Sequence, residues 1–163
     1  MIKKILIALA IVFVAIQFIR PKKNISGENQ YDISTQYNVP PEIATLLKGS
    51  CNDCHSNYTR YPWYSNVQPG AWWLNNHITE GKGHLNFSEF TNLKAASQYH
   101  KFEEIAEMVE KKEMPLSSYT MLGLHSEADL SDKERETLVL WALGQREMMK
   151  VIYPTDSLER KRR

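Results

Sequence analysis

The sequence lacks several signals that would indicate a β-protein or a nucleic-acid-binding protein. No segment alternates apolar and polar residues over the length of a strand, and no Asn-Gly or Asp-Gly pair marks a hairpin. No segment recurs at a fixed period, which excludes a repeat architecture. The 20 lysines and arginines are balanced by 19 aspartates and glutamates. Nucleic-acid recognition depends on clustered lysine and arginine, so we do not expect this protein to bind nucleic acid. Because strand signals are missing, we expect an all-α fold.

An apolar run opens the chain. It extends from Ile5 to Ile19, is interrupted only by Gln17 and has basic residues on both sides. Such a run rises only about 22 Å as a helix, which suits a signal-peptide core and is short for a membrane span. No small-residue cleavage site follows it. We therefore expect residues 1–20 to be an uncleaved signal anchor, a single transmembrane helix in the inner membrane.

Composition divides the rest of the chain into three parts. Residues 21–38 are polar and predict a tether that holds a domain off the membrane. Residues 39–149 carry helical patterns and predict the folded domain. Residues 150–163 end in four consecutive basic residues and predict a solvated basic tail.

Four stretches of the domain have helical patterns. Residues 40–49 begin with two prolines, place three apolar side chains on one face and are expected to stop at a glycine. A second helix is expected over residues 71–79, and residues 102–109 repeat apolar side chains at i, i+3, i+4 and i+7. Ser131 and Glu134 have the spacing of a capping box, which predicts a long last helix.

The segment Cys51-Asn52-Asp53-Cys54-His55 has the attachment pattern of c-type haem. Two thiols three positions apart on one turn can reach the two vinyl groups on one edge of the porphyrin, and the adjacent imidazole can bind the iron. The sequence thus predicts one haem c, covalently bound through Cys51 and Cys54, with His55 as an axial iron ligand. Because c-type haem is attached outside the bacterial inner membrane, the domain is expected to face the periplasm.

Three other uses of two close cysteines were weighed against haem. A redox pair needs a thioredoxin-like βαβ context, which the helical pattern does not provide. A structural zinc site needs further ligands, and no second Cys or His pair stands out. A disulfide between residues three apart closes too small a loop to stabilise the chain much. Haem is the favoured interpretation. It would also give the long loops expected at about 56–70 and 80–97 something to pack against.

Met114 is the predicted second axial ligand. It follows the helix over residues 102–109 and precedes Pro115, so a loop can turn its thioether inward. Cytochromes c commonly place methionine opposite histidine. His77 is the alternative ligand, because it shares a helical face with apolar and aromatic side chains. The remaining histidines lie in polar stretches and are expected at the surface: His84, His100 and His125.

Residues 58–64 form a second conspicuous stretch, rich in aromatic rings. Trp63 within it is expected to wall the haem. Arg60 is expected to pair with a haem propionate through charge-assisted hydrogen bonds. The alternative is an aromatic mini-core beneath a long loop.

With these residues in hand, the chain resembles the bacterial haem-binding domain family, a small cytochrome-c-like group defined by a Cys-x-x-Cys-His motif. The resemblance covers about residues 40–146, and one departure is Phe90, where a tryptophan is expected. It implies a helical, cytochrome-c-like fold with long loops around a covalent haem, in an extracytoplasmic setting. It is carried by these residues: Cys51–Asn57, Thr59–Ser65, Pro69, Trp73, His77, Glu80-Gly81, Leu85–Ser88, Glu113–Pro115, Tyr119, Leu130–Glu134 and Trp141-Ala142.

These patterns favour an electron carrier over an enzyme. An iron with protein ligands on both sides leaves no open position for a substrate. The expected partners are redox proteins, in particular respiratory components of the membrane, that meet the domain through small, transient interfaces. If Met114 does not bind the iron, a five-coordinate haem enzyme of peroxidase type, or a gas or redox sensor, is the alternative. A structural subunit with an assembly haem also remains open.

Overall fold

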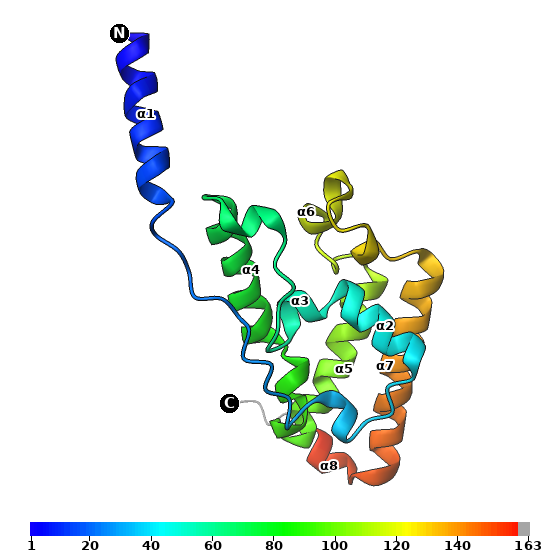
Figure 1. The fold of residues 1–163 in the computed structure, drawn as a ribbon. Coiled ribbons are helices and arrows are strands. Elements are labelled where there is room, and N and C mark those ends of the chain that lie inside the picture. The colour runs from blue at the N-terminus through cyan, green and yellow to red at the C-terminus, as the bar shows by residue number, and fades with distance from the viewer. Residues whose placement is uncertain (160–163) are drawn as a thin grey trace.

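The computed structural model describes residues 1–159 (Figure 1). This part of the chain is helical with no strand, as the residue patterns predicted. Ile25 and Tyr58 form an isolated antiparallel bridge. The last four residues of the predicted basic tail, 160–163, lie outside the described residues. The α-helices are α1 (Ile2–Ile16), α2 (Pro41–Ser50), α3 (Asn52–His55), α4 (Gly70–His84), α5 (Ala95–Glu110), α6 (Ser117–Thr120), α7 (Asp132–Ile152) and α8 (Thr155–Leu158). The 3-10 helices are η1 (Ile33–Thr35), η2 (Trp63–Asn66), η3 (Phe87–Asn92), η4 (Met121–Gly123) and η5 (Ser126–Ala128).

Helix α2 begins where the prolines predicted. Pro41 occupies the first turn, where its missing N–H costs no hydrogen bond. The three apolar side chains of the predicted face are buried. The expected stop at Gly49 is wrong, because the helix continues to Ser50. A Cβ at Gly49 would lie 3.0 Å from the carbonyl oxygen of Glu127, so this glycine permits a close approach by η5.

The capping box at the start of α7 is confirmed. The Ser131 hydroxyl accepts the backbone N–H of Glu134 at 3.3 Å, and the Glu134 carboxylate accepts the N–H of Ser131 at 2.8 Å. From there α7 extends along α5, and the two helices lie side by side (Figure 1). Phe102 of α5 meets Trp141 of α7 edge to face, with ring centroids 5.8 Å apart. The contact between α5 and α7 is the most extensive contact between two helices in the described residues.

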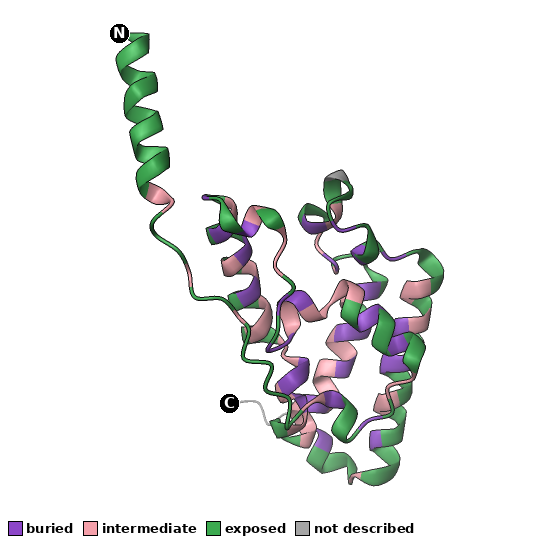
Figure 2. Cartoon of the chain, in the orientation of Figure 1, coloured by how far each residue is buried: buried purple, intermediate pink, exposed green. Residues whose placement is uncertain are grey.

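The buried apolar side chains form two clusters, which we call the large core and the small core. Figure 2 marks the buried residues along the chain. The large core joins α2, α5, α7 and η3. The small core lies between α4 and the segment that contains α6 and η5. Its buried members are Leu74, Ile78, Tyr119 and Ala128.

The long loop expected over residues 80–97 is wrong. Helix α4 continues to His84, η3 follows at Phe87–Asn92, and α5 already begins at Ala95. Phe87 and Phe90, three positions apart on one side of η3, are both buried in the large core. The burial of these two rings stabilises η3, although the local sequence pattern of this segment predicted a loop.

Ordered packing extends beyond both ends of residues 39–149. In the segment expected to be a tether, Ile33 is buried in the large core and the Asn24 amide donates to the Ser56 carbonyl at 2.9 Å. At the other end α7 continues to Ile152, and Leu158 of α8 is buried in the large core. Both flanks of the domain therefore contribute to its packing.

Helix α1 projects from the domain and is exposed almost all round (Figures 1 and 2). Gln17, the polar interruption of the apolar run, joins its end to the start of α4. Its side-chain oxygen accepts the Gln68 N–H at 2.9 Å, and the Gln68 amide donates to the Ile19 carbonyl at 2.7 Å. In residues 1–159 no helix combines the length and apolar character needed to cross a membrane, so the expected transmembrane helix is not supported.

Candidate functional site

The cysteine motif forms the short helix α3, which lies at the junction of the two cores. Cys51 ends α2 and packs against the large core, whereas Cys54 packs against the small core. Helix α3 packs against both α2 and α4. Both cysteines are free thiols, half-buried at the surface of these clusters.

Burial makes these thiols weak acids. It raises the pKa of Cys51 to about 12, with a further increase from the neighbouring Cys54. Burial likewise raises the pKa of Cys54 to about 11, with a further increase from the Asp53 carboxylate. A nucleophilic redox cysteine needs a lowered pKa, so this environment counts against the redox-pair alternative.

The ring of His55 is oriented by two backbone carbonyls of α4 and its C-terminus. Its Nδ1 atom lies 3.0 Å from the Gly81 oxygen and 3.0 Å from the Leu85 oxygen. Carbonyl oxygens can only accept, so Nδ1 carries the proton and Nε2 keeps a free lone pair. Burial lowers the pKa of His55, although the two carbonyls oppose this shift. The imidazole is therefore neutral and offers Nε2 as a metal ligand.

Gly81 brings α4 against the cysteine motif. A Cβ at this position would lie 2.8 Å from the carbonyl oxygen of Cys54 and 3.2 Å from its Cβ. Only glycine permits this approach, which places the Gly81 carbonyl within reach of His55. Glycine is unfavourable inside a helix, and this signal could have identified the position from sequence.

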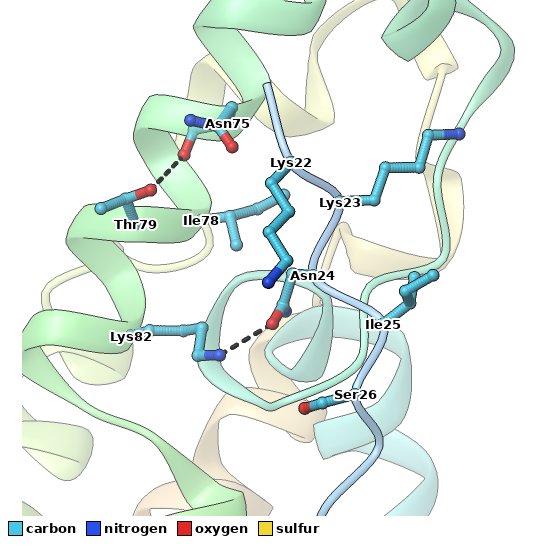
Figure 3. Close-up of a pocket in the computed structure, with 9 residues that line it drawn as sticks. All are labelled: Lys22, Lys23, Asn24, Ile25, Ser26, Asn75, Ile78, Thr79 and Lys82. Carbon is cyan, nitrogen blue, oxygen red and sulfur yellow. Dashed lines mark hydrogen bonds between the residues drawn. The ribbon is translucent and has the colours of Figure 1, made fainter. Parts of the chain in front are cut away.

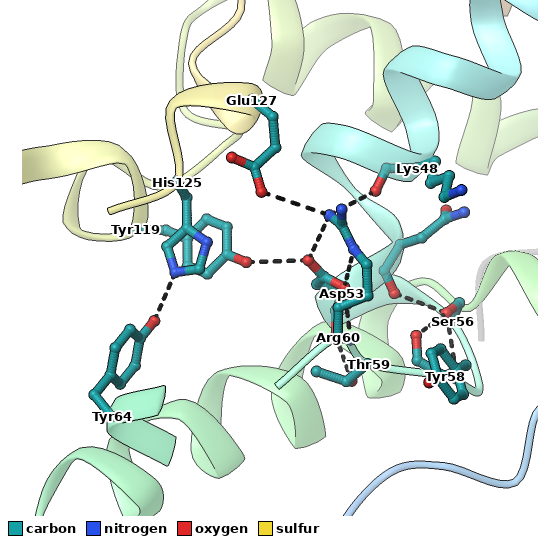
Figure 4. Close-up of polar contacts among 11 residues, drawn as sticks. Lys48, Asp53, Ser56, Tyr58, Thr59, Arg60, Tyr64, Tyr119, His125 and Glu127 are labelled. Atoms are coloured by element: carbon teal, nitrogen blue, oxygen red, sulfur yellow. Dashed lines mark hydrogen bonds and ion pairs between the residues drawn. The ribbon is translucent and has the colours of Figure 1, made fainter. Parts of the chain in front are cut away.

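Asp53, between the two cysteines, is buried and bound by Arg60 (Figure 4). Arg60 Nε donates to Asp53 Oδ1 at 3.1 Å and Arg60 Nη2 to Oδ2 at 2.8 Å. The same Nη2 donates to the Lys48 carbonyl at 3.0 Å and lies 3.9 Å from Glu127. In this structure Arg60, expected to bind a propionate, instead joins α3 to the end of α2. This two-point pairing raises the pKa of Arg60.

A buried aromatic chain continues from Asp53 and was missed by sequence reasoning (Figure 4). Tyr119 donates to Asp53 Oδ2 at 3.2 Å and stacks on His125, with ring centroids 3.9 Å apart. His125 Nε2 lies 2.8 Å from the Tyr64 hydroxyl. The expectation of a surface histidine is wrong here, because the side chain of His125 is only 6% exposed. Burial lowers its pKa, so a neutral ring accepts from Tyr64.

The other predicted residues lie on separate elements. Met114 is half-buried after α5; its N–H donates to the Met108 carbonyl at 3.1 Å, and its own carbonyl accepts from Arg135 at 2.7 Å. His77 lies on α4, one turn before Gly81, and its Nδ1 is buried without a hydrogen-bond partner. Trp63 on η2 is 73% exposed, with its ring edge-on to Tyr64 at a centroid distance of 6.0 Å.

The zinc alternative has no ligand set. Within residues 1–159, no three His, Cys, Asp or Glu side chains are grouped closely enough to hold a metal ion. Cys51, Cys54 and His55 lie within about one turn of each other, at and just before α3. This arrangement suits a group that itself supplies the remaining ligands of its metal.

A comparison with known protein families found a match. A family model described as "Haem-binding domain" matches residues 11–143, which is most of the chain and includes the segment 21–38. No curated protein and no solved structure matches the sequence. The chain thus belongs to the haem-binding domain family.

Proposed function

We propose that the chain is a monohaem c-type cytochrome in which Cys51 and Cys54 bind the haem covalently and His55 Nε2 binds its iron. One observation carries the proposal: the carbonyls of Gly81 and Leu85 fix the His55 tautomer, one residue from the second thiol. Haem-ligating histidines depend on such a partner on the other ring nitrogen. The raised thiol pKa values favour this use over thiolate chemistry.

Met114 is our proposed second ligand. Tyr119, five residues after Met114, donates to Asp53 of the motif at 3.2 Å, and this contact supports a position of the following segment close to the motif. The carbonyl bond to Arg135 holds the backbone of Met114 without using its thioether. His77 is the alternative, since its unpaired buried nitrogen is free to bind.

The proposed activity is one-electron transfer. A bound haem supplies an iron that changes between two oxidation states. The chain contributes two apolar clusters that exclude water around α3, and a His55 ring that hydrogen bonds prevent from rotating. Ligands held this firmly change little between oxidation states, and this favours an electron carrier.

A haem enzyme of peroxidase type or a gas sensor is the second candidate. The observation in its favour is again His77, whose Nδ1 is buried next to Trp73 with no partner. In a five-coordinate site such a nitrogen can donate to or accept from a small ligand. His77 would then contact the small molecule bound to the iron and would not bind the iron itself.

We propose a membrane location facing the periplasm, with redox proteins of the membrane as partners. Helix α1 exposes only apolar side chains over most of its length, and such a surface favours lipid over water. Trp72 donates from its indole to the Ile19 carbonyl at 3.0 Å, close to the end of this helix. Tryptophan is enriched at membrane interfaces. The bonds of Gln17 to Gln68 would keep the domain close to the lipid surface.

An optical spectrum of the haem-loaded chain tests the function. For an electron carrier, carbon monoxide leaves the reduced spectrum unchanged, and the ferric protein has a thioether-to-iron band near the red end. Met114→Ala removes that band, whereas His77→Ala keeps it. A large shift on adding carbon monoxide to the wild type would contradict the closed iron and favour the enzyme or sensor.

A further inference from the structure

A second candidate site lies along α4, where the chain after α1 passes beside this helix. Residues 22–26 run along this helix and, with it, line a cavity of about 570 Å³ that is open to solvent (Figure 3). The cavity contains three lysines and no acidic side chain. Its lining consists of Lys22, Lys23, Asn24, Ile25, Ser26, Asn75, Ile78, Thr79 and Lys82.

Two of these lysines face each other across the cavity. Figure 3 shows Lys22 extending toward Asn24 and Lys82, whereas Lys23 points away. Lys82 Nζ donates to the Asn24 side-chain oxygen at 2.7 Å, which leaves two of its three N–H groups for another acceptor. Within residues 1–159 no carboxylate forms an ion pair with Lys22 or Lys82. Two unpaired ammonium groups repel each other and attract an anion.

The environment of Lys82 supports this interpretation. The side chain is half-buried. Burial lowers its pKa, although the more distant Glu89 opposes the shift. A cation that has lost part of its hydration without a carboxylate partner gains most from a bound anion.

The wall opposite α4 is fixed in place by hydrogen bonds. The N–H of Asn24 donates to the Tyr61 hydroxyl at 2.6 Å, and its side-chain amide donates to the Thr59 hydroxyl at 3.0 Å. The next residue, Ile25, forms the bridge to Tyr58. The cavity is therefore formed before any ligand binds, and the ligand does not have to order a loop.

We propose that this cavity binds the phosphate monoester group of a small organic molecule. A phosphate monoester carries close to two negative charges at neutral pH, which match Lys22 and Lys82. The side chain of Ile78, on α4, gives the cavity an apolar surface for the organic part. The volume falls in the range of small-molecule sites and is larger than a bare phosphate needs. The site is independent of the haem chemistry proposed above.

Titration of the haem-loaded full chain in zwitterionic detergent with glycerol phosphate tests the site, with binding followed by calorimetry. Saturable binding is expected, and Lys82→Gln should weaken it at least about tenfold, as the loss of a charge-assisted hydrogen bond requires. Lys82→Arg should retain most of the affinity. Arg20→Gln is the matched control: it removes a nearby positive charge outside the cavity lining and should change the affinity less than twofold. An unchanged haem spectrum verifies that each variant is folded.

A second arm identifies the source of the phosphate. The chain is mixed with phosphatidylcholine vesicles with and without phosphatidic acid, a membrane-borne phosphate monoester, and bound protein is sedimented. Binding that increases with phosphatidic acid and is lost in Lys82→Gln assigns a lipid source, whereas Lys82-dependent binding of glycerol phosphate alone assigns a soluble ligand. If Lys82→Gln and Arg20→Gln weaken binding equally, or if neither probe binds, the proposal is overturned.

Discussion

The Nδ1 atom of His55 lies 3.0 Å from the carbonyl oxygen of Gly81, the α4 residue at which a Cβ would lie 2.8 Å from the carbonyl oxygen of Cys54. The same glycine thus sets both the distance of α4 from the motif and the orientation of the imidazole. A displacement of α4 would weaken both together, because a carbonyl that moves away can no longer hold the ring.

Gly81→Ala is expected to destabilise the fold by about 1–3 kcal/mol, although alanine is the better helix former. The new Cβ would lie 2.8 Å from a backbone oxygen, which cannot move without shifting α3. We also expect a lower ratio of haem to protein, because His55 loses its fixed orientation. Chemical denaturation and haem absorbance measure the two effects.

Gly83→Ala is the matched control on the same helix. A Cβ at Gly83 meets nothing within 4 Å, so the substitution should leave haem content unchanged and stabilise the chain slightly. Equal effects of the two substitutions would show that helix propensity, and not the approach to Cys54, governs the result.

Asp53→Asn should cost about 1–3 kcal/mol of stability. The buried carboxylate accepts from Arg60 on both of its oxygens and from Tyr119 on Oδ2, whereas the asparagine amide keeps only one accepting oxygen. Glu147→Gln breaks an exposed pair with Lys150 and should cost less than about 1 kcal/mol. Urea unfolding of the three proteins makes the comparison. A cost for Asp53→Asn no larger than that of Glu147→Gln would contradict the role of the buried pair.

His125→Gln should flatten the dependence of stability on pH. Burial lowers the pKa of His125 below its ordinary 6.5, and Arg60 adds to this shift, while Glu127 and Asp53 oppose it. The unfolded chain therefore takes up the proton first, so the wild type loses stability as the pH falls through about 6.5 toward the folded pKa. Glutamine can bond to Tyr64 without titrating.

The free energy of unfolding at pH 7.5 and pH 5.5 measures this effect. The wild type should lose more stability between the two values than His125→Gln does. His84→Gln, which removes an exposed histidine, should follow the wild type. If His84→Gln flattens the dependence as much as His125→Gln, the buried ring is not its source.

Sequence reasoning succeeded where the signal is local. The start of α2 at Pro41 and the capping box of Ser131 with Glu134 depend on residues within one turn of each other. Cys51, Cys54 and His55 also lie within about one turn of each other, so the structure brings them together as their spacing predicted. For such features the spacing of residues along the chain determines which side chains meet.

It failed where long-range contacts decide. Ile33 and Asn24 lie in a polar segment, and only their partners in the domain show that this segment is packed. His125 bonds to Tyr64, 61 positions earlier in the chain, and this contact helps to bury its ring. The residues next to each of these positions in the sequence do not indicate such long-range contacts.

Intact mass spectrometry under denaturing conditions detects the proposed covalent bond between haem and the two cysteines. The chain is produced in cells that attach c-type haem, alongside a variant that combines Cys51→Ala with Cys54→Ala. We expect the wild type, and not the variant, to carry the added mass of one haem after unfolding. A wild-type mass without this addition, in protein that was red before denaturation, would contradict it.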